Sequence, residues 1–296
     1  MSELRAAVHV AEPIPFVNPI PNAKPGFWSP ISCTLIYSAK EAVLVDTPIT
    51  TEQTHKLIDW IRRIAPDRKL SYVYITHGHG DHFFGISLIR QHFPETKIVA
   101  TTAVIEHMKQ QLDPEVFKEV WESRFPNQIP HQEPLTFITP ISPQSGFHLE
   151  DRWLLQPVEC GHTDTYDSTI LWVESLKLAV CGDVVYGQVH QMLFEANTSE
   201  KRAEWIRDIE KVEALEPVYV VPGHRQSEEI DGKWHLESTK KYIRDSERIA
   251  LANSGDGKVI FEKMMAQYSE RYNPAALLLS VKGFMMAAEN FSEKAF

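Results

Sequence analysis

The sequence is poor in cysteine, with Cys33, Cys160 and Cys181 as the three examples among 296 residues. A small and odd set of thiols excludes a disulfide framework and is typical of a reducing compartment. A chain of this length can instead bury a large apolar core, in one domain or two. The remaining composition, 43% hydrophobic and 24% charged, is ordinary for a globular protein.

Long hydrophobic runs and an excess of positive charge are also missing. No segment reaches the ~20 apolar residues that cross a bilayer, and residues 1–17 contain charges and prolines where a secretory signal has an apolar centre. We therefore expect a cytoplasmic protein without a membrane partner. The net charge of −10 argues against nucleic acid, which is bound by clustered Lys and Arg. A small-molecule substrate is the expected partner.

Apolar residues recur with the period of a helix in some segments and with the period of a strand in others. Leu57, Ile58, Ile61 and Ile64 predict an amphipathic helix over 51–64. Strands are expected at 33–37, 42–45, 70–75, 98–100, 153–158, 168–173, 178–181 and 218–221. Further helices are expected near 86–89, at 102–125 with an interruption near Pro114, at 200–215 and after 234. This order predicts an α/β (α+β) fold, with two sheets packed face to face and helices outside.

The remaining segments suggest how the chain is divided. Residues 13–30 are rich in proline and should be extended, and 126–148 should form a long loop. We expect a catalytic domain over 1–252 and a helical extension over 253–296 that packs on the same domain. Its amphipathic part, 274–291, could cover the core or form a homodimer contact, and core cover is the favoured interpretation.

The densest cluster of metal-binding side chains is Thr76–His82, directly after the expected strand 70–75. His77 and His79 are two residues apart, so in an extended segment their imidazoles point to the same side and can bind one ion. Asp81 and His82 follow and can face a second ion. A solvated polar loop is the alternative, but four ligand-type residues in six positions make it the weaker one.

Three distant residues could complete the coordination. His162, Asp183 and His224 each follow an expected strand, and each has a glycine within two residues upstream. Any one of them alone would be interpreted as a turn residue. Together with the cluster they predict two coordination shells.

This pattern resembles the metallo-β-lactamase superfamily over roughly residues 30–235. The resemblance implies an αββα sandwich of four layers with a binuclear metal site at one edge. It also implies a role for Asp46, at the end of the strand 42–45, as a supporting residue; a turn residue is the alternative. The implied ligands are His77, His79 and His162 for the first metal, Asp81, His82 and His224 for the second, and Asp183 as the bridge.

A bridging aspartate resembles the lactonase and glyoxalase-II branches of that family rather than true β-lactamases. Tyr186, three residues after Asp183, resembles the tyrosine that binds the substrate carbonyl in lactonases, with core packing as the alternative. Imidazoles and carboxylates suit two zinc ions, and manganese or iron accept the same donors. Asp81, Asp183 and a bridging hydroxide would leave the centre net positive, and either aspartate could pass a proton to the leaving atom.

The expected activity is metal-dependent hydrolysis of a small cyclic amide or ester, as in a lactamase or lactonase acting on a xenobiotic or signalling molecule. An apolar or aromatic substrate is predicted by side chains in segments that could approach the site, with core or lid packing as the alternative for each: Phe27, Trp28, Trp121, Phe125, Tyr186, Met192 and Phe194. One alternative keeps the metals and changes the bond, to a glutathione thioester or an isothiocyanate. Cations at 240–248 could then bind glutathione, although a solvated helix face explains them better. Another alternative is a non-catalytic protein with a structural metal, but structural zinc sites are closed four-ligand shells.

Overall fold

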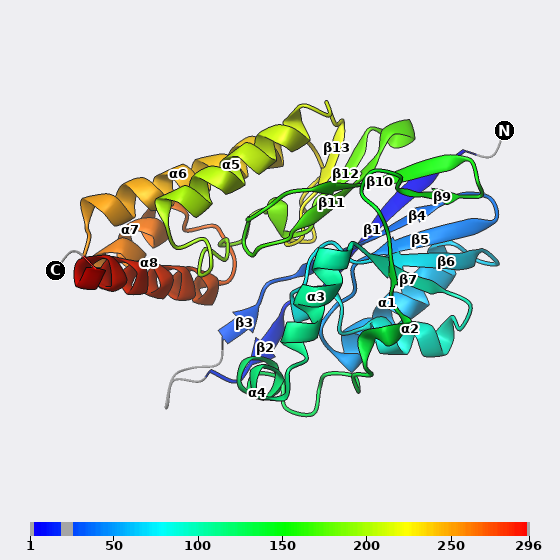
Figure 1. The fold of residues 1–296 in the computed structure, drawn as a ribbon, viewed down its shortest axis with the longest axis horizontal. Helices are drawn as coiled ribbons and strands as arrows, with labels where there is room; N and C mark the ends of the chain where they lie inside the picture. Colours follow the sequence, from blue (N-terminus) through cyan, green and yellow to red (C-terminus); the bar gives the residue numbers. More distant parts are fainter. Residues whose placement is uncertain (1–2, 19–25, 295–296) are drawn as a thin grey trace.

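The computed structural model describes residues 3–18 and 26–294, and its strands form two main sheets and a short ribbon (Figure 1). The first sheet has the order β1 (Arg5–Ala11), β4 (Ile31–Tyr37), β5 (Glu41–Val45), β6 (Lys69–Tyr74), β7 (Lys97–Ala100), β8 (Thr139–Pro140). The second has the order β13 (Tyr219–Val221), β12 (Leu178–Val180), β11 (Thr169–Val173), β10 (Trp153–Glu159), β9 (Phe147–Leu149). The ribbon pairs β2 (Ile14–Phe16) with β3 (Gly26–Trp28).

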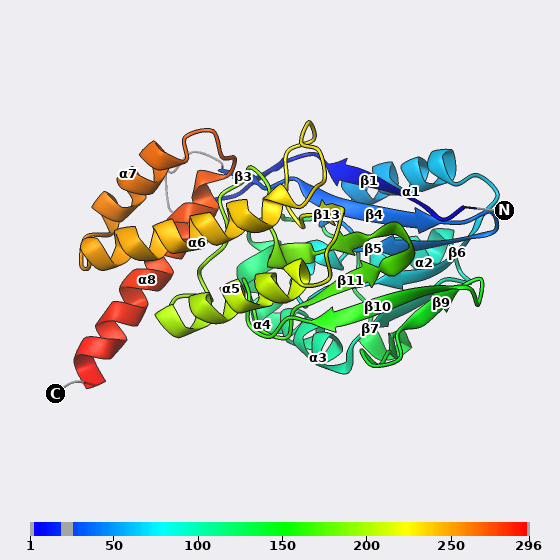
Figure 2. The same cartoon turned by 90° about the horizontal axis from the view of Figure 1, so that it is seen from above.

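Helices cover the outer face of each sheet, as Figures 1 and 2 show from two directions. The helices are α1 (Thr51–Ile64), α2 (Ile86–His92), α3 (Thr102–Gln111), α4 (Pro114–Val116), α5 (Ser199–Glu213), α6 (Trp234–Ala252), α7 (Gly257–Gln267) and α8 (Pro274–Lys294). Three apolar clusters separate the layers: one under α1–α3, one between the sheets, and one under α5–α8. The predicted αββα sandwich is confirmed.

The first helix illustrates how local sequence sets an element's bounds. Thr50 accepts a hydrogen bond from the Gln53 amide, and the Gln53 side chain returns to the Thr50 backbone, which forms a capping box. Leu57, Ile58 and Ile61 are buried on the face toward the first sheet. The observed helix, Thr51–Ile64, has the bounds that the apolar spacing predicts.

Several segments differ from the expectation. β1 was not predicted; it is an edge strand that pairs with β4 and is largely half-buried, so its apolar alternation is weak. The region 126–148 contains β8 and β9 rather than only loop. The helical region 102–125 is divided near Pro114 as expected, since α3 ends at Gln111 and Pro114 begins a new turn. Within the proline-rich segment, 19–25 lie outside the described residues.

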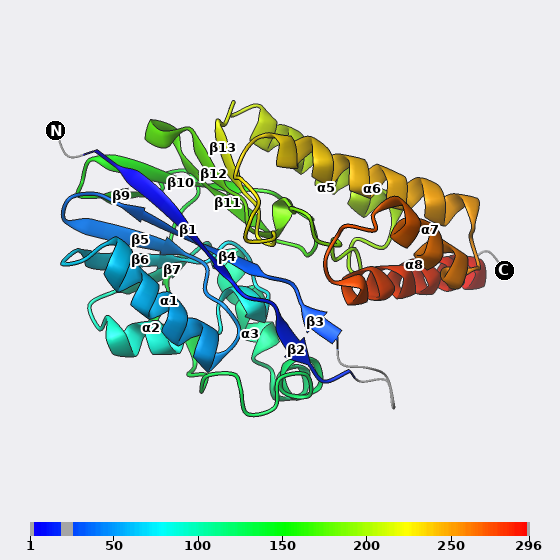
Figure 3. The same ribbon diagram turned by 180° about the vertical axis from the view of Figure 1, so that it is seen from behind.

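The C-terminal helices lie at the end of the molecule away from β9 and the N-terminus (Figure 3). Ile260 and Met264 of α7 and Leu277, Val281 and Phe284 of α8 belong to the same buried cluster as α5 and α6. Within the described residues, no helix is both long and apolar enough to cross a membrane.

Candidate metal centre and active-site cavity

The candidate ligands lie in loops at one edge of the sandwich. The strand β6 leads into Thr76–His82, β12 into Asp183 and β13 into His224. The pairs β5–β6 and β12–β13 are parallel, so the loops after them leave the same edge of each sheet. Backbone hydrogen bonds join the two sheets beside this edge, from Thr169 N to Thr76 O at 2.9 Å and from Ser32 N to Gly223 O at 2.8 Å.

The structure brings these side chains into two adjacent groups. In the first, ligand atoms of His77, His79 and Asp164 lie within 4.8 Å of one another. In the second, those of Asp81, His82 and His224 do the same.

Asp183 lies against the second group with both of its carboxylate oxygens. Its Oδ1 is 3.2 Å from His82 Nε2, and its Oδ2 is 3.3 Å from His224 Nε2. Together with Asp183, the two groups bring six of the seven expected ligands to one place.

The seventh expected ligand, His162, is not part of either group. Its Nδ1 lies 3.0 Å from Thr163 O, and its backbone amide donates to Glu204 Oε1 at 3.0 Å. Two residues later, the fully buried Asp164 places its Oδ2 2.9 Å from His79 Nδ1 and 3.9 Å from His77 Nε2. Asp164 thus takes the place expected for His162. Because the two residues are two apart, an extended segment can present either of them to the same side.

Each of the four imidazoles is oriented by a contact to one ring nitrogen, so that the other nitrogen faces the groups above. The orienting contacts are Thr76 Oγ1 to His77 Nδ1 at 3.0 Å, Glu195 Oε1 to His79 Nε2 at 3.3 Å, Asp46 Oδ2 to His82 Nδ1 at 2.9 Å, and Pro30 O to His224 Nδ1 at 2.8 Å. Such outer partners fix the ring and its tautomer in metal sites.

Buried polar atoms at the centre supply the test of whether a metal fits here. His77 Nε2 has no hydrogen-bond partner, and Asp164 Oδ2 and Asp183 Oδ1 face imidazole nitrogens of His79 and His82 at 2.9 and 3.2 Å. An unsatisfied buried polar atom costs about 1–3 kcal/mol, and these three converge with further imidazole and carboxylate donors. Divalent cations would satisfy all of them, so the donor set fits the metals that the sequence predicts.

Asp46 supports the centre instead of completing it. One carboxylate oxygen accepts from the Thr76 amide at 2.9 Å, and the other accepts from Thr76 Oγ1 at 2.7 Å and lies 2.9 Å from His82 Nδ1. The backbone beside the centre is also constrained. A Cβ on Gly223, just after β13, would collide with Asp183, so only glycine fits there.

The titrating groups influence one another strongly. Burial acts to raise the pKa of Asp183, but the charges on His224 and His82 outweigh it and hold that pKa well below its usual range. Burial acts to lower the pKa of His224, but the Asp183 carboxylate raises it to about 10. Burial raises the pKa of Asp164 to about 6, against the charge of His79. The carboxylate of Asp183 and the imidazoles of His82 and His224 thus stabilise one another's charged forms.

Two residues beside the candidate metal centre make contacts that the sequence does not predict. Tyr186 is buried, and its hydroxyl donates to Asp183 Oδ2, so in this structure it contacts the expected bridge. Glu195 was not singled out, because no motif marks it; its Oε2 accepts from Thr165 Oγ1 at 2.7 Å while its Oε1 faces His79. Trp28 Nε1 donates to Asp81 Oδ2 at 2.8 Å.

A cavity of about 570 Å³ opens beside the centre. His79, Asp81, Asp164, Asp183 and His224 form its polar wall. Its apolar wall includes Trp28, Trp121, Tyr186, Met192 and Phe194, which were named from the sequence. Two other aromatic candidates lie elsewhere: Phe125 lines a different cavity, and Phe27 is 49% exposed.

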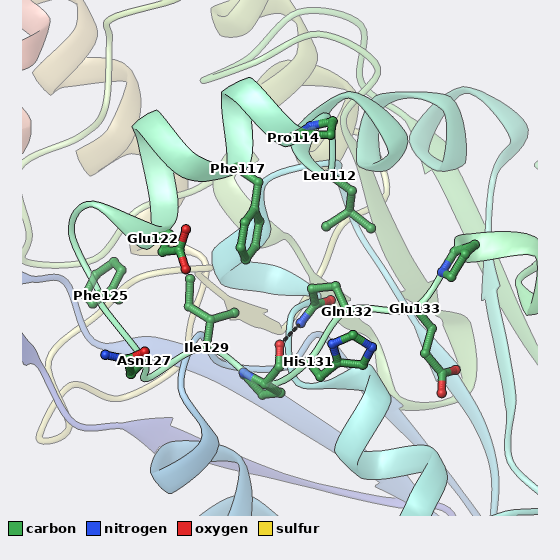
Figure 4. A pocket seen from close by; sticks show the side chains of 12 residues that line it. Leu112, Pro114, Phe117, Glu122, Phe125, Asn127, Ile129, His131, Gln132 and Glu133 are labelled. Carbon is green, nitrogen blue, oxygen red and sulfur yellow. Dashed lines mark hydrogen bonds between the residues drawn. The ribbon is translucent and has the colours of Figure 1, made fainter.

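That different cavity, of about 530 Å³, lies between the α4 region and residues 127–134 (Figure 4). Leu112 and Phe117 face Ile129 and Gln132 across it. None of the candidate metal ligands lines it, so it is separate from the chemistry proposed below.

The sequence profile of the metallo-β-lactamase superfamily matches residues 26–224. No curated protein gives a significant match.

Solved structures of metallo-β-lactamases share the fold at low sequence identity. DIM-1 metallo-β-lactamase exposed to ceftazidime aligns with a TM-score of 0.57 at 18% identity, over 83% of this chain and 97% of that chain. The metallo-β-lactamase from Pontibacter korlensis gives 0.57 at 15% identity, over 83% and 100%. FIM-1 from Pseudomonas aeruginosa, in its mono-zinc form, gives 0.54 at 14% identity, over 82% and 92%. Because the profile match spans more than half of the sequence, the chain belongs to the metallo-β-lactamase superfamily.

Proposed function

We propose that this protein is a metal-dependent hydrolase that opens a small, apolar or aromatic cyclic amide or ester. The observation that carries the proposal is the convergence of imidazole and carboxylate groups on the wall of one cavity. We further propose two ions, with zinc the best match to the donors. Bound divalent ions would bring the pKa of water near neutrality and polarise a substrate carbonyl.

The protein side chains supply orientation and proton transfer. The apolar wall, with Trp28 and Trp121 at a ring distance of 5.6 Å, would hold a flat ring and exclude water from it. Asp183 places Oδ1 3.2 Å from His82 Nε2, and its Oδ2 accepts a hydrogen bond from Tyr186. Asp183 or Asp81 would move the proton to the leaving nitrogen or oxygen.

A glutathione thioester is the weaker candidate substrate, because the cations expected to bind it are already paired along α6. Lys240 Nζ lies 2.7 Å from Glu213, and Lys241 Nζ lies 2.6 Å from Asp245. Arg244 and Arg248 contact acidic side chains as well. None of these four cations lines the cavity beside the metal centre.

Replacing Tyr186 with phenylalanine tests the role of its hydrogen bond to Asp183. We expect kcat to fall about tenfold, because one hydrogen bond to a charged group contributes about 1.5–3 kcal/mol, with metal content unchanged. If Tyr186 instead binds the substrate carbonyl equally in the ground state and in the transition state, KM will rise and kcat will stay constant. Steady-state kinetics with metal analysis distinguish the two results.

Zinc binding to the metal-free protein should release protons at pH 7. His224, with its pKa raised to about 10, is protonated there and must lose that proton to coordinate. Its protonated form stabilises the metal-free fold below its unfolded pKa of about 6.5, and this contribution is lost as pH rises through about 10. Zinc affinity should therefore rise with pH from 6.5 to 10. Titration calorimetry in buffers of different ionisation enthalpy measures the release, and binding without proton release would contradict the assignment.

A turnover screen tests the function itself. Metal-loaded protein would be assayed against lactams, lactones, thioesters and isothiocyanates, with a chelated sample as control. Hydrolysis of a cyclic amide or ester that chelation abolishes is the expected result. Turnover of thioesters alone would replace the proposed substrate class, and a metal-retaining protein without turnover would favour a structural metal.

A further inference from the structure

One residue that lines the cavity beside the metal centre has a buried polar atom that the centre does not explain. This residue is His190, and its Nε2 has no hydrogen-bond partner. His190 Nε2 belongs to neither metal group, and an unsatisfied buried nitrogen of this kind costs about 1–3 kcal/mol unless something binds it.

The backbone at His190 is held firmly in place. Its amide donates to Tyr272 O at 2.8 Å, and the Tyr272 amide donates to Gln188 O at 3.0 Å. Arg271 adds hydrogen bonds to the carbonyls of Gly187 and Val189, at 3.0 and 2.8 Å. The ring is therefore fixed by the segment that leads into α8, and it is fully buried.

Tyr242 determines which ring nitrogen carries the proton. The Tyr242 hydroxyl lies 2.8 Å from His190 Nδ1. Among the hydrogen bonds of the described residues, this ring nitrogen is the one acceptor for the phenol hydrogen, so Nδ1 accepts it and the ring proton lies on Nε2. Burial and the guanidinium of Arg271 lower the pKa of His190 to about 4, so the ring is neutral at pH 7.

A neutral N–H group on an otherwise largely apolar wall selects for a specific kind of ligand. It offers no charge to attract an anion, and Met192 and Phe194 follow it in the chain and line the same cavity. A carbonyl or ether oxygen on an apolar ring matches such a donor.

We propose that His190 is a specificity-determining residue whose Nε2–H binds an acceptor oxygen of the substrate, distinct from the carbonyl that reacts. This inference rests on the proposed hydrolase function and narrows its substrate to neutral aromatic lactams or lactones that carry a second oxygen acceptor. Tyr242 acts as the positioning residue, through the tautomer that it imposes.

Nuclear magnetic resonance tests the tautomer independently of turnover. In ¹⁵N-labelled, zinc-loaded protein, the His190 ring signals are assigned by their loss in His190→Gln. We expect the proton on Nε2 in the wild type and a mixture of both tautomers in Tyr242→Phe. A wild-type proton on Nδ1 would overturn the proposal.

Substrate selectivity supplies the second test, with dihydrocoumarins that carry a methoxy group at each aromatic position and their ethyl analogues. For one methoxy isomer we expect a KM about three- to tenfold below that of its ethyl partner, the range of one neutral hydrogen bond. His190→Phe, which keeps a ring without the donor, should abolish this preference. His190→Gln, whose amide nitrogen lies near the position of Nε2, should restore part of it. Thermal unfolding of each variant checks that it folds.

The two levels of proposal fail separately. If no dihydrocoumarin is hydrolysed but the methoxy compound shifts the Nε2 resonance and the ethyl compound does not, the inference stands and the hydrolase function fails. If turnover occurs and His190→Phe keeps the same methoxy preference as the wild type, the inference fails and the function stands. Should His190→Phe not fold, the tautomer of Tyr242→Phe and its loss of methoxy preference decide.

Discussion

Replacing Asp183 with asparagine is expected to lower kcat by more than about 100-fold while the fold stays intact. Replacing a residue that only contacts a metal ligand already lowers metal affinity or activity by about 10- to 100-fold. Asp183 is itself a candidate ligand, so a larger effect is expected. Its two oxygens face His82 and His224 at 3.2 and 3.3 Å. An amide of the same shape keeps one acceptor but loses the negative charge. Kinetics of the metal-replete variant, with circular dichroism for the fold, measure the effect.

Asp167→Asn is the matched control for this substitution. Asp167 is exposed, and its φ of 56° lies in the left-handed region that asparagine adopts readily. It lies outside the groups of candidate ligands, so its variant should retain wild-type kcat. Near-normal turnover by a metal-replete Asp183→Asn sample would exclude Asp183 from the reaction.

The sequence was sufficient for the parts of the fold where periodicity and local capping agree. The bounds of α1 follow from its apolar spacing and the capping box at Thr50. The strand β1 could not be found in this way, because it is an edge strand whose pairing with β4 is decided by tertiary structure. The cluster Thr76–His82 was found because all of its groups are local in sequence.

The distant part of the centre depends on register, which a single sequence does not determine. His162-Thr163 and Asp164-Thr165 are successive pairs with the same spacing, so a shift of two residues exchanges one candidate for the other. In the structure, the Thr165 hydroxyl donates to Glu195 Oε2 at 2.7 Å, and Asp164 rather than His162 lies beside His79. Glu195 in turn contacts His79, so the contacts that orient the first group depend on a residue that no motif indicates.

The choice between His162 and Asp164 also changes the charge of the centre. With Asp81 and Asp183 as the carboxylate ligands, two divalent ions would keep an excess of positive charge. Asp164 adds a third carboxylate, buried and 2.9 Å from His79 Nδ1. With a bridging hydroxide, the formal charges would then balance. Carboxylate oxygen is also a harder donor than imidazole nitrogen. A first site with two imidazoles and one carboxylate therefore has a stronger preference for iron or manganese over zinc than a site with three imidazoles.

Paired alanine variants of these two residues test that assignment. Asp164→Ala should lower the metal affinity of the first site by at least about 10- to 100-fold. Metal content should then fall from two ions per chain toward one. His162→Ala should keep both ions, because the Glu204 contact is made by its backbone amide. Elemental analysis after dialysis at limiting metal, with the absorption spectrum of the cobalt-substituted protein, measures the occupancy of each site. The opposite pattern, with metal lost from His162→Ala and kept by Asp164→Ala, would restore the three-histidine site.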